Sequence, residues 1–501
     1  MVDKLTAKSH RMLFFNTFAF TICFAVWTFN GVMITFLVDN GLYDFSAVQI
    51  GWLFGIPILT GSIFRLPMGI YTDKFGGKWV FSALLLFCAI PMYLYSYADS
   101  FWGFFLCSLG FGMAGTGFAV GIANTSVWYT KEWQGRALGI FGAGNAGAAL
   151  TTLLAPTLLN WFTGGNAMEH WRVLPQVYAG VLVLTGIMLL VFTENKKHAI
   201  QNQTMREMLQ PLKSSKVWRF GLYYFLVFGC FVAISQWLVP YFVNVYAASL
   251  VVAGLLASVF SLPSGLIRAL GGWMADIFGA RKVMLWVFGI SIAGCFFLSI
   301  PRMEVFSPGR SVMASKGGEV SFVSDSMIRV GNKEYPVILK EQLETGTEEY
   351  GTLILPTKDK WQYPVVLEGE QVKKKQVLAK GITRIYFQAN MWIFAILVFI
   401  IGTAWGIGKA GVYKFIPDYF PDSVGVVGGM VGVIGGLGGF FGPIIFGYLL
   451  EWTGLWTSSW MFLFALSVVC LWWMRSTIAR MIRNVAPEIS NRFDMKKQTI
   501  N

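Results

Sequence analysis

The stretch RLPMGIYTDKFGGK at residues 65–78 recurs as RALGGWMADIFGAR at residues 268–281. Both copies have Arg at the first position, Gly four residues later, Asp at eight, Phe at ten, Gly at eleven and a cation at thirteen. Six matches at fixed positions indicate an internal repeat rather than chance. We therefore expect two halves of similar structure, each with one copy of this motif.

The composition indicates a membrane protein. Hydrophobic residues make up 55% of the 501 residues and charged residues only 13%, against roughly 45–50% and about 25% in soluble domains. About 20 apolar residues cross a bilayer as a helix, and the uncharged stretches of this chain are 12–38, 45–64, 79–98, 100–130, 137–168, 173–193, 220–267, 283–301, 385–408, 423–450 and 452–474. The stretch 220–267 is long enough for two crossings around a turn near Asn244 to Ser249, so we expect twelve helices.

Each motif copy begins inside a span and ends in the loop after the second span of its half. The prediction is an all-α membrane protein with two six-helix halves in parallel orientation, which resembles the fold of the major facilitator transporters. The loop pattern GxxxDxxGxxK/R resembles that superfamily's conformational motif. Its residues are Gly69, Asp73 and Gly76 in the first half and Gly272, Asp276 and Gly279 in the second.

The charged segments predict the divisions of the chain. The linker that joins the two halves differs from the first half in its high density of charged residues. A polar insertion interrupts the second half. The predicted parts are the first half at 1–193, a cytoplasmic linker at 194–219, helices seven to nine at 220–301, an extracytoplasmic insertion at 302–384, helices ten to twelve at 385–475 and a basic cytoplasmic tail at 476–501.

The net charge of +13 is explained by orientation rather than by nucleic acid. Lys and Arg gather at the two ends of the chain, in the linker and in the motif loops, whereas the short loops of the opposite side contain only Arg172. The positive-inside rule then places both termini in the cytoplasm, in a bacterial-type inner membrane. The first apolar stretch, 12–38, has no small-residue cleavage site and is interpreted as an uncleaved span.

The sequence of the insertion predicts a small β module. Apolar and polar residues alternate along it, and the segments 330–333 and 346–351 are typical of turns. The stretch VLEGEQVKKKQVLAKG (366–381) faintly resembles half of a biotinyl or lipoyl sandwich. With no partner half and no modifiable-lysine motif, an uncommitted β module is the better interpretation.

Neither a metal site nor an enzyme is indicated. The six cysteines lie inside apolar stretches without CxxC spacing, and the three histidines lie outside the spans. The chain contains no Walker A loop and no GxGxxG after a strand. We therefore expect no catalytic residues, no metal, no cofactor and no nucleic-acid partner, and we expect a monomer.

Arg65 and Arg268 are the main candidate site residues. Each lies eight residues before its motif Asp, and hence roughly 12 Å into the membrane from the loop. An intramembrane cation costs at least about 2.5–3.5 kcal/mol and marks a pathway or finds a partner. Snorkelling to the surface is the alternative, but a matched pair on equivalent helices favours a central site. The spans contain no Asp or Glu, so a substrate anion is the simplest counter-charge.

Two helices are unusually rich in glycine: GIFGAGNAG (139–147) and GVVGGMVGVIGGLGGFFG (425–442). Small residues let membrane helices approach closely and slide, although static packing without a site role explains them equally well. The glycines singled out are Gly142, Gly144, Gly147, Gly435, Gly436, Gly438 and Gly439. Asn145 can donate to an anion or form a hydrogen bond to another helix.

These segments, together with GTGFAVG at residues 115–121, resemble the nitrate/nitrite porter (NarK-type) family of the major facilitator superfamily, over both halves and excluding the insertion. The resemblance implies that Arg65 and Arg268 clasp the anion and that Asn145 lies near it. It also implies that Tyr224 and Phe228 close the pocket and that Phe118 stacks near the substrate; for these three aromatics ordinary packing is equally compatible with the sequence.

Lys409 lies about one and a half turns before Lys414 and is either a snorkelling cation or a third cation near the site. The predicted function is secondary transport of nitrate, nitrite or both by alternating access. Two fixed cations without a resident counter-charge repel each other in the empty carrier, which favours nitrate/nitrite exchange. Proton-coupled nitrate symport, a porter for another small anion such as a carboxylate, and a non-transporting sensor are the alternatives.

Overall fold

The computed structural model describes residues 7–164, 167–196, 210–300, 303–339, 357–387, 390–420 and 424–485. The chain divides into a helical unit, Met1–Ser299 with Ala395–Asn501, and a smaller β unit, Ile300–Phe394. The middle of the predicted linker, most of the predicted tail and the predicted turn at 346–351 lie outside the described residues.

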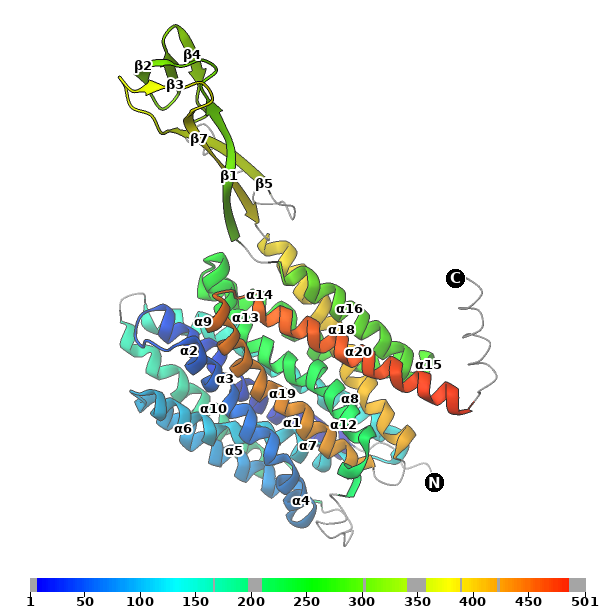
Figure 1. The fold of residues 1–501 in the computed structure, drawn as a ribbon. Coiled ribbons are helices and arrows are strands. Elements are labelled where there is room, and N and C mark those ends of the chain that lie inside the picture. The colour runs from blue at the N-terminus through cyan, green and yellow to red at the C-terminus, as the bar shows by residue number, and fades with distance from the viewer. Residues whose placement is uncertain are drawn as a thin grey trace. The chain divides into compact units, whose positions relative to one another are not determined.

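The first half of the helical unit is a series of helices that are mostly broken once within the bundle (Figure 1). Its elements are α1 (Ala7–Trp27), α2 (Asn30–Asp39), α3 (Ala47–Ile63), α4 (Arg65–Phe75), α5 (Gly77–Leu94), η1 (Tyr95–Tyr97), α6 (Phe101–Phe111), η2 (Gly112–Thr116), α7 (Gly117–Ser126), α8 (Lys131–Gly142), η3 (Ala143–Ala146), α9 (Gly147–Thr163), η4 (Met168–Arg172) and α10 (Val173–Phe192).

The second half repeats this plan and ends in three long helices. Its elements are η5 (Gln210–Lys213), α12 (Ser215–Tyr224), the π-helical turn η6 (Phe225–Cys230), α13 (Phe231–Tyr246), α14 (Leu250–Leu266), α15 (Arg268–Phe278), α16 (Ala280–Leu298), α18 (Met391–Tyr419), α19 (Val424–Thr453) and α20 (Ser458–Val485).

The predicted twelve spans are confirmed when each bent helix is taken as one crossing. Ten helices of the described residues are long and apolar enough to cross a membrane, and two bent pairs raise the number to twelve. The pairs are α3 with α4, bent by 40°, and α14 with α15, bent by 52°. Arg65 and Arg268 are the first residues after these bends, so the sequence repeat is also a repeat of backbone shape.

The motif glycines fall into two groups. Gly76 and Gly279 join the bent helices to α5 and α16 with φ of 91° and 83° and ψ of 148° and 139°. This extended region at positive φ is occupied almost only by glycine, and it costs other residues of order 1–3 kcal/mol. Gly69 and Gly272 have no atom within 4 Å of the place where a Cβ would lie. Backbone conformation therefore requires glycine at the first two positions, whereas packing in this structure does not require it at the second two.

The two halves meet along two helix pairs, α3 with α19 and α9 with α14 (Figure 1). A Cβ on Gly51 of α3 would lie 2.5 Å from the carbonyl oxygen of Pro443, and one on Gly254 of α14 would meet the carbonyl oxygen of Thr152. Gln236 Nε2 of α13 also donates to the Phe54 carbonyl of α3 at 3.2 Å. Small residues thus bring the halves into backbone contact along these faces.

The β unit confirms the predicted β-rich insertion. One sheet has the order β1-β7-β5 and the other β4-β3-β2-β6, and Gly331 forms the predicted turn between β3 and β4 with a φ of 57°. Its core contains Val320, Ile328, Tyr335, Val372 and Leu378. The strands are β1 (Met303–Met313), β2 (Gly318–Val323), β3 (Met327–Val330), β4 (Lys333–Pro336), β5 (Thr357–Pro364), β6 (Gln371–Val372) and β7 (Val377–Phe387).

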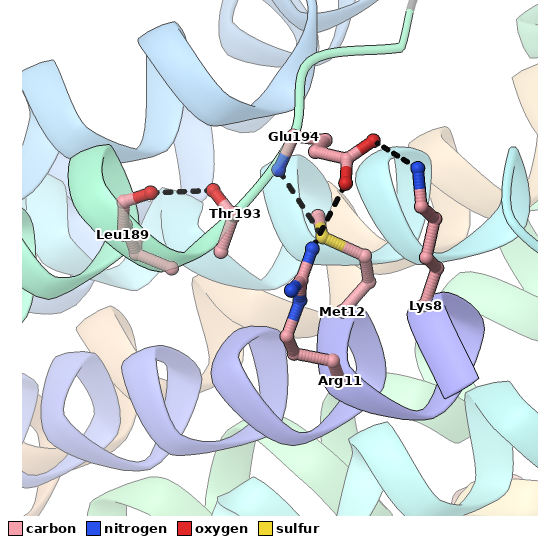
Figure 2. A network of polar contacts seen from close by, with 6 residues as sticks. All are labelled: Lys8, Arg11, Met12, Leu189, Thr193 and Glu194. Carbon is pink, nitrogen blue, oxygen red and sulfur yellow. Dashed lines mark hydrogen bonds and ion pairs between the residues drawn. The ribbon is translucent and has the colours of Figure 1, made fainter.

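The segment after α10 is tied to the start of α1 (Figure 2). Glu194 accepts hydrogen bonds from Lys8 Nζ at 3.2 Å and from Arg11 Nη2 at 2.9 Å, and its backbone N–H donates to Met12 Sδ at 3.4 Å. The hydrogen bond from Lys8, with that from Arg11, holds the pKa of the Glu194 carboxyl below its usual value. The first and last helices of this half are therefore linked through one carboxylate.

We predict that Glu194→Gln lowers the thermal midpoint slightly at neutral pH. A carboxyl whose pKa is lowered by folding contributes its full stability above its unfolded-state pKa, and the contribution disappears as pH falls through the lower folded-state pKa. The difference between wild type and variant should therefore vanish on acidification through that range. Thermal melting of both proteins at a series of pH values measures it. Glu169→Gln is the control, because Glu169 makes no ion pair with a described residue.

We also predict that replacing residues 304–382 with a short Gly/Ser linker leaves the helical unit folded. Met303 pairs with Phe387 across the β1–β7 ladder, and Thr383 lies four residues before Phe387 on β7. The two ends to be joined are therefore roughly 14 Å apart, a distance that a short linker spans. The hydrophobic core of the β unit is formed by its own residues. Membrane insertion, monodispersity and the thermal midpoint measure the outcome. An aggregated or poorly inserted variant would contradict the prediction.

Candidate functional site

Arg65 lies at the bend between α3 and α4, inside an aromatic cage. The side chain is 5% exposed, and its guanidinium carbon lies 5.3 Å from the ring centres of Trp27 and Phe228 and 5.4 Å from that of Phe118. Nη1 donates to the carbonyl of Gly432 in α19 at 3.1 Å. The cation is thus held by ring faces and one carbonyl, and by both halves of the protein.

Arg268 occupies the equivalent bend in the second half. Its guanidinium carbon lies 5.6 Å from the ring centre of Phe118 and 5.5 Å from that of Tyr413. Phe118 therefore contacts both cations, one from each half. The structure brings Arg65, Arg268 and Phe118 together.

Buried polar atoms without partners gather around these two arginines. Nε and Nη2 of Arg65, Nη1 of Arg268 and Oγ of Ser62 are buried and have no hydrogen-bond partner among the described residues. Within the same part of the chain, no Asp or Glu forms an ion pair with either guanidinium. Buried cations without a carboxylate are costly, and a small oxyanion would supply both the charge and the acceptors that the site lacks.

The predicted aromatic pair lies beside this cage. The Tyr224 and Phe228 rings stack with centres 4.9 Å apart, and Tyr413 contacts Tyr224 edge-on at 5.0 Å. Tyr224 ends α12 and Phe228 lies in the π-helical turn that follows, an irregularity that is frequent at functional sites. All three rings therefore line the side of the site that the second half provides.

The glycine-rich helices approach the site at different points. A Cβ on Gly436 would meet Ser62 Oγ and lie 3.5 Å from Arg65 Nη1, and one on Gly142 would lie 3.4 Å from Arg268 Cδ. The remaining glycines pack against neighbouring helices: Gly144 against Phe20, Gly147 against Thr21, Gly435 against Tyr224, Gly438 against Phe225 and Gly439 against Ile58. Two of the seven therefore adjoin the arginines.

Asn145 is buried, but its amide is directed differently from the prediction. Nδ2 donates to the carbonyl of Gly142 at 2.7 Å, within the same span, and Oδ1 has no partner among the described residues. This bond uses one of the two N–H groups of the amide, and it lies within the residue's own span rather than between helices. The second N–H group can donate to an anion without breaking the bond to the Gly142 carbonyl.

Lys409 is inside the protein rather than at its surface. The side chain is 0% exposed, and Nζ donates to Ser264 Oγ at 3.0 Å. The ammonium lies 3.2 Å from the ring centre of Phe231 and 5.9 Å from that of Phe228, which it shares with Arg65. Snorkelling does not occur here, and a third basic side chain adjoins Arg65 through the shared Phe228 ring.

Three residues of the cage were not identified from the sequence. Ser62 precedes Arg65 by three residues and Tyr413 follows Lys409 by four, so helical spacing would have placed each on the same face as a residue already singled out. Trp27 carries no such signal. It lies in a continuous apolar stretch, and its Nε1 donates to the Pro57 carbonyl at 2.7 Å.

The loop motif of the second half makes an ion pair. Asp276 forms an ion pair with Lys414 of α18, with 2.6 Å between Nζ and Oδ1. Asp73 occupies the equivalent position on α4. In the second half the motif thus fastens the end of α15 to α18.

Comparison with known proteins agrees with this geometry. The pattern of the Major Facilitator Superfamily matches residues 15–312. The chain belongs to this superfamily. It is therefore a multi-pass membrane protein, and the resemblance noted from the motif is confirmed.

Two relatives within the superfamily carry descriptions of transport. A Thermus thermophilus protein described as a probable nitrate/nitrite antiporter, NarK1, is 37% identical over 493 residues, which cover 97% of this chain and 95% of the relative. A Bacillus subtilis nitrite extrusion protein is 26% identical, covering 62% of this chain and 77% of its own.

Solved structures match the superfamily fold at low identity. A bacterial homologue of the lysosomal transporter Spinster, in an inward-facing and unoccupied conformation, has a TM-score of 0.60 at 12% identity and covers 94% of this chain and 96% of its own. The nucleoside transporter NupG has a TM-score of 0.59 at 14% identity, covering 93% of this chain and 99% of its own. These likenesses bear on the fold alone.

We predict that Gly436→Ala destabilises the protein although alanine favours helices. The added methyl meets Ser62 Oγ, and overpacking costs typically about 1–3 kcal/mol. Gly429→Ala is the matched control on the same helix, because a Cβ there has no atom within 4 Å. Thermal melting should show a lower midpoint for the first variant and an unchanged or higher one for the second. Equal midpoints would mean that α19 does not need glycine beside Arg65.

Proposed function

We propose that this chain is a secondary transporter that exchanges nitrate and nitrite, with Arg65 and Arg268 binding the anion between the two halves. The observation that carries the proposal is the pair of equivalent guanidiniums on one phenylalanine ring, with unpaired N–H groups and no described carboxylate beside them. A guanidinium offers two parallel N–H donors, which suit a planar oxyanion. The description of the Thermus thermophilus relative supports the choice of nitrate and nitrite.

Exchange is favoured over net uptake by the charge of the empty site. Two cations without a resident anion repel each other in a medium of low dielectric constant, so the empty carrier resists closing around them. An anion removes this repulsion and makes the loaded carrier ready to change conformation. Both termini lie in the cytoplasm in this proposal, and the protein acts as a monomer in a bacterial-type inner membrane.

Transport into liposomes tests the coupling. We expect entry of labelled nitrate to require nitrite or nitrate inside, and to be insensitive to an imposed proton gradient. Formate and acetate should compete poorly with nitrate. Equal competition by these carboxylates would instead indicate a carboxylate porter. Absence of any flux would favour a sensor.

Lys409 supports a second candidate function, proton-coupled nitrate symport. It is a fully buried amine that shares Phe228 with Arg65, and intramembrane titratable groups commonly serve as proton relays. In this case nitrate would enter empty liposomes down a proton gradient and acidify the lumen. Lys409→Met would then abolish the gradient dependence, whereas the exchange proposal expects no gradient dependence in either protein.

We predict that Arg65→Lys and Arg268→Lys each weaken nitrate binding by roughly 10- to 100-fold while the protein still inserts. Lysine keeps the charge but loses the planar fork, and a hydrogen bond to a charged group is worth about 1.5–3 kcal/mol. Arg136→Lys is the control, since Arg136 is exposed and stacks on Trp133 away from the cage. Nitrate binding and exchange measure the outcome. Near-wild-type exchange by both site variants would remove the arginine clamp from the mechanism.

A further inference from the structure

A second basic site lies in the C-terminal half, in a groove between the ends of α12, α16, α18 and α20. Two arginines, Arg219 and Arg281, line this groove together with Tyr223 and Tyr419. None of these residues belongs to the cage around Arg65 and Arg268. Anion exchange therefore gives no reason for two cations here.

Arg219 is the most unusual residue of the groove. Its side chain is only 9% exposed, and no hydrogen bond or ion pair joins it to another described residue. Its guanidinium contacts the ring of its neighbour Phe220 at 5.3 Å. A buried cation normally has a carboxylate or several acceptors around it, so Arg219 lacks an anionic partner.

Two hydroxyl groups extend the polar side of the groove. The Tyr223 hydroxyl, one turn after Arg219, is buried without a hydrogen-bond partner in the described structure. Arg281 Nη2 donates to the Tyr419 hydroxyl at 2.7 Å, which holds the second guanidinium at the groove. The site thus offers two cations and an unused hydroxyl donor, a set that suits the non-bridging oxygens of a phosphate group.

Apart from Thr477, the remaining lining is apolar. Phe220 and Phe415 stack with ring centres 5.1 Å apart, and Met474 and Ile478 of α20 complete the wall. Phe220, Phe415 and Met474 are already buried, whereas Ile478 and Met481 at the edge of the groove are half-buried. A free inorganic anion gains nothing from this edge, but a lipid acyl chain that covers it gains burial of apolar surface.

The groove lies where a lipid headgroup would be expected. Arg281 is the second residue of α16 and Tyr419 is the last residue of α18, so both mark the ends of spans. Trp218 and Trp286, on the same two helix ends as Arg219 and Arg281, are 51% and 47% exposed, and exposed Trp near span ends is typical of the membrane interface. Basic pockets between spans at this level bind anionic headgroups.

We propose that this groove binds an anionic phospholipid, with Arg219, Arg281 and the Tyr223 hydroxyl on the phosphodiester and an acyl chain along its half-buried edge at Ile478 and Met481. The lipid supplies the counter-charge that Arg219 lacks. It also occupies the junction of four helices of one half, so its binding stabilises that half.

The test uses the full chain, purified in detergent and delipidated. Phosphatidylglycerol, phosphatidylcholine with the same acyl chains, and glycerophosphate are each titrated while the thermal midpoint is recorded. We expect a saturable rise with phosphatidylglycerol alone. The double variant Arg219→Gln with Arg281→Gln should weaken its apparent affinity at least about tenfold, the effect of losing about 1.4 kcal/mol of binding free energy.

The matched control is Arg475→Gln with Arg480→Gln, which removes two exposed cations of α20 that do not line the groove. This control should retain the affinity within about twofold of wild type. If the double groove variant does not fold, Arg281→Gln and Tyr223→Phe, made singly, decide the question by the same titration, each with a several-fold loss.

Three results would overturn the proposal. Equal stabilisation by phosphatidylcholine would mean that the charge is not recognised. Equal stabilisation by glycerophosphate would mean a site for free phosphate rather than for lipid. Unchanged affinity in the groove variants, or an equal loss in the control, would mean that the two arginines do not form the site.

Discussion

Two guanidinium groups inside the same membrane-spanning bundle, Arg65 buried and Arg268 half-buried, have no described carboxylate beside them and constrain most of what this protein can be. Each charge resists transfer into a medium of low dielectric constant. Ring faces of Trp27, Phe118 and Phe228 and one backbone carbonyl reduce the cost for Arg65. They do not neutralise it, because a ring quadrupole contributes much less than an opposite charge. The site therefore remains electrostatically incomplete until an anion enters.

The repeat makes this arrangement symmetrical. Each arginine follows a bend between two helical segments, and each motif closes with a glycine at positive φ. Because the bends are equivalent in the two halves, the two cations reach the same level of the bundle and share Phe118. The close glycine contacts along α3 with α19 and along α9 with α14 then let the halves approach around that level. Charge, backbone shape and packing thus arise from one duplicated segment.

The sequence predicted the fold well, since long uncharged stretches and a repeated motif depend on local composition. It also predicted which cations meet, because equivalent positions of a repeat occupy equivalent places. It did not predict Trp27, Ser62 or Tyr413, whose roles depend on contacts between helices far apart in the chain. The burial of Lys409 was left open because it depends on Ser264, a hydroxyl that only the packing of α14 against α18 brings near.

Asn145 illustrates the limit of transferring a role by resemblance. The resemblance implies an amide near the anion, and the structure shows one N–H of that amide donating to the carbonyl of Gly142 in the same span. The irregular segment η3, between α8 and α9, holds the residue there. A sequence motif specifies which side chain is present, whereas the local backbone decides which of its atoms are available.

The pairing of Met303 with Phe387 makes the β unit a side branch of the chain. To the helices on either side, a branch whose two ends touch is equivalent to a short hairpin, however many residues it contains. The entropy of loop closure between α16 and α18 is then set by the ribbon's first pair rather than by the length of the insertion. This junction can therefore gain or lose a whole domain during evolution with little thermodynamic consequence for the helices.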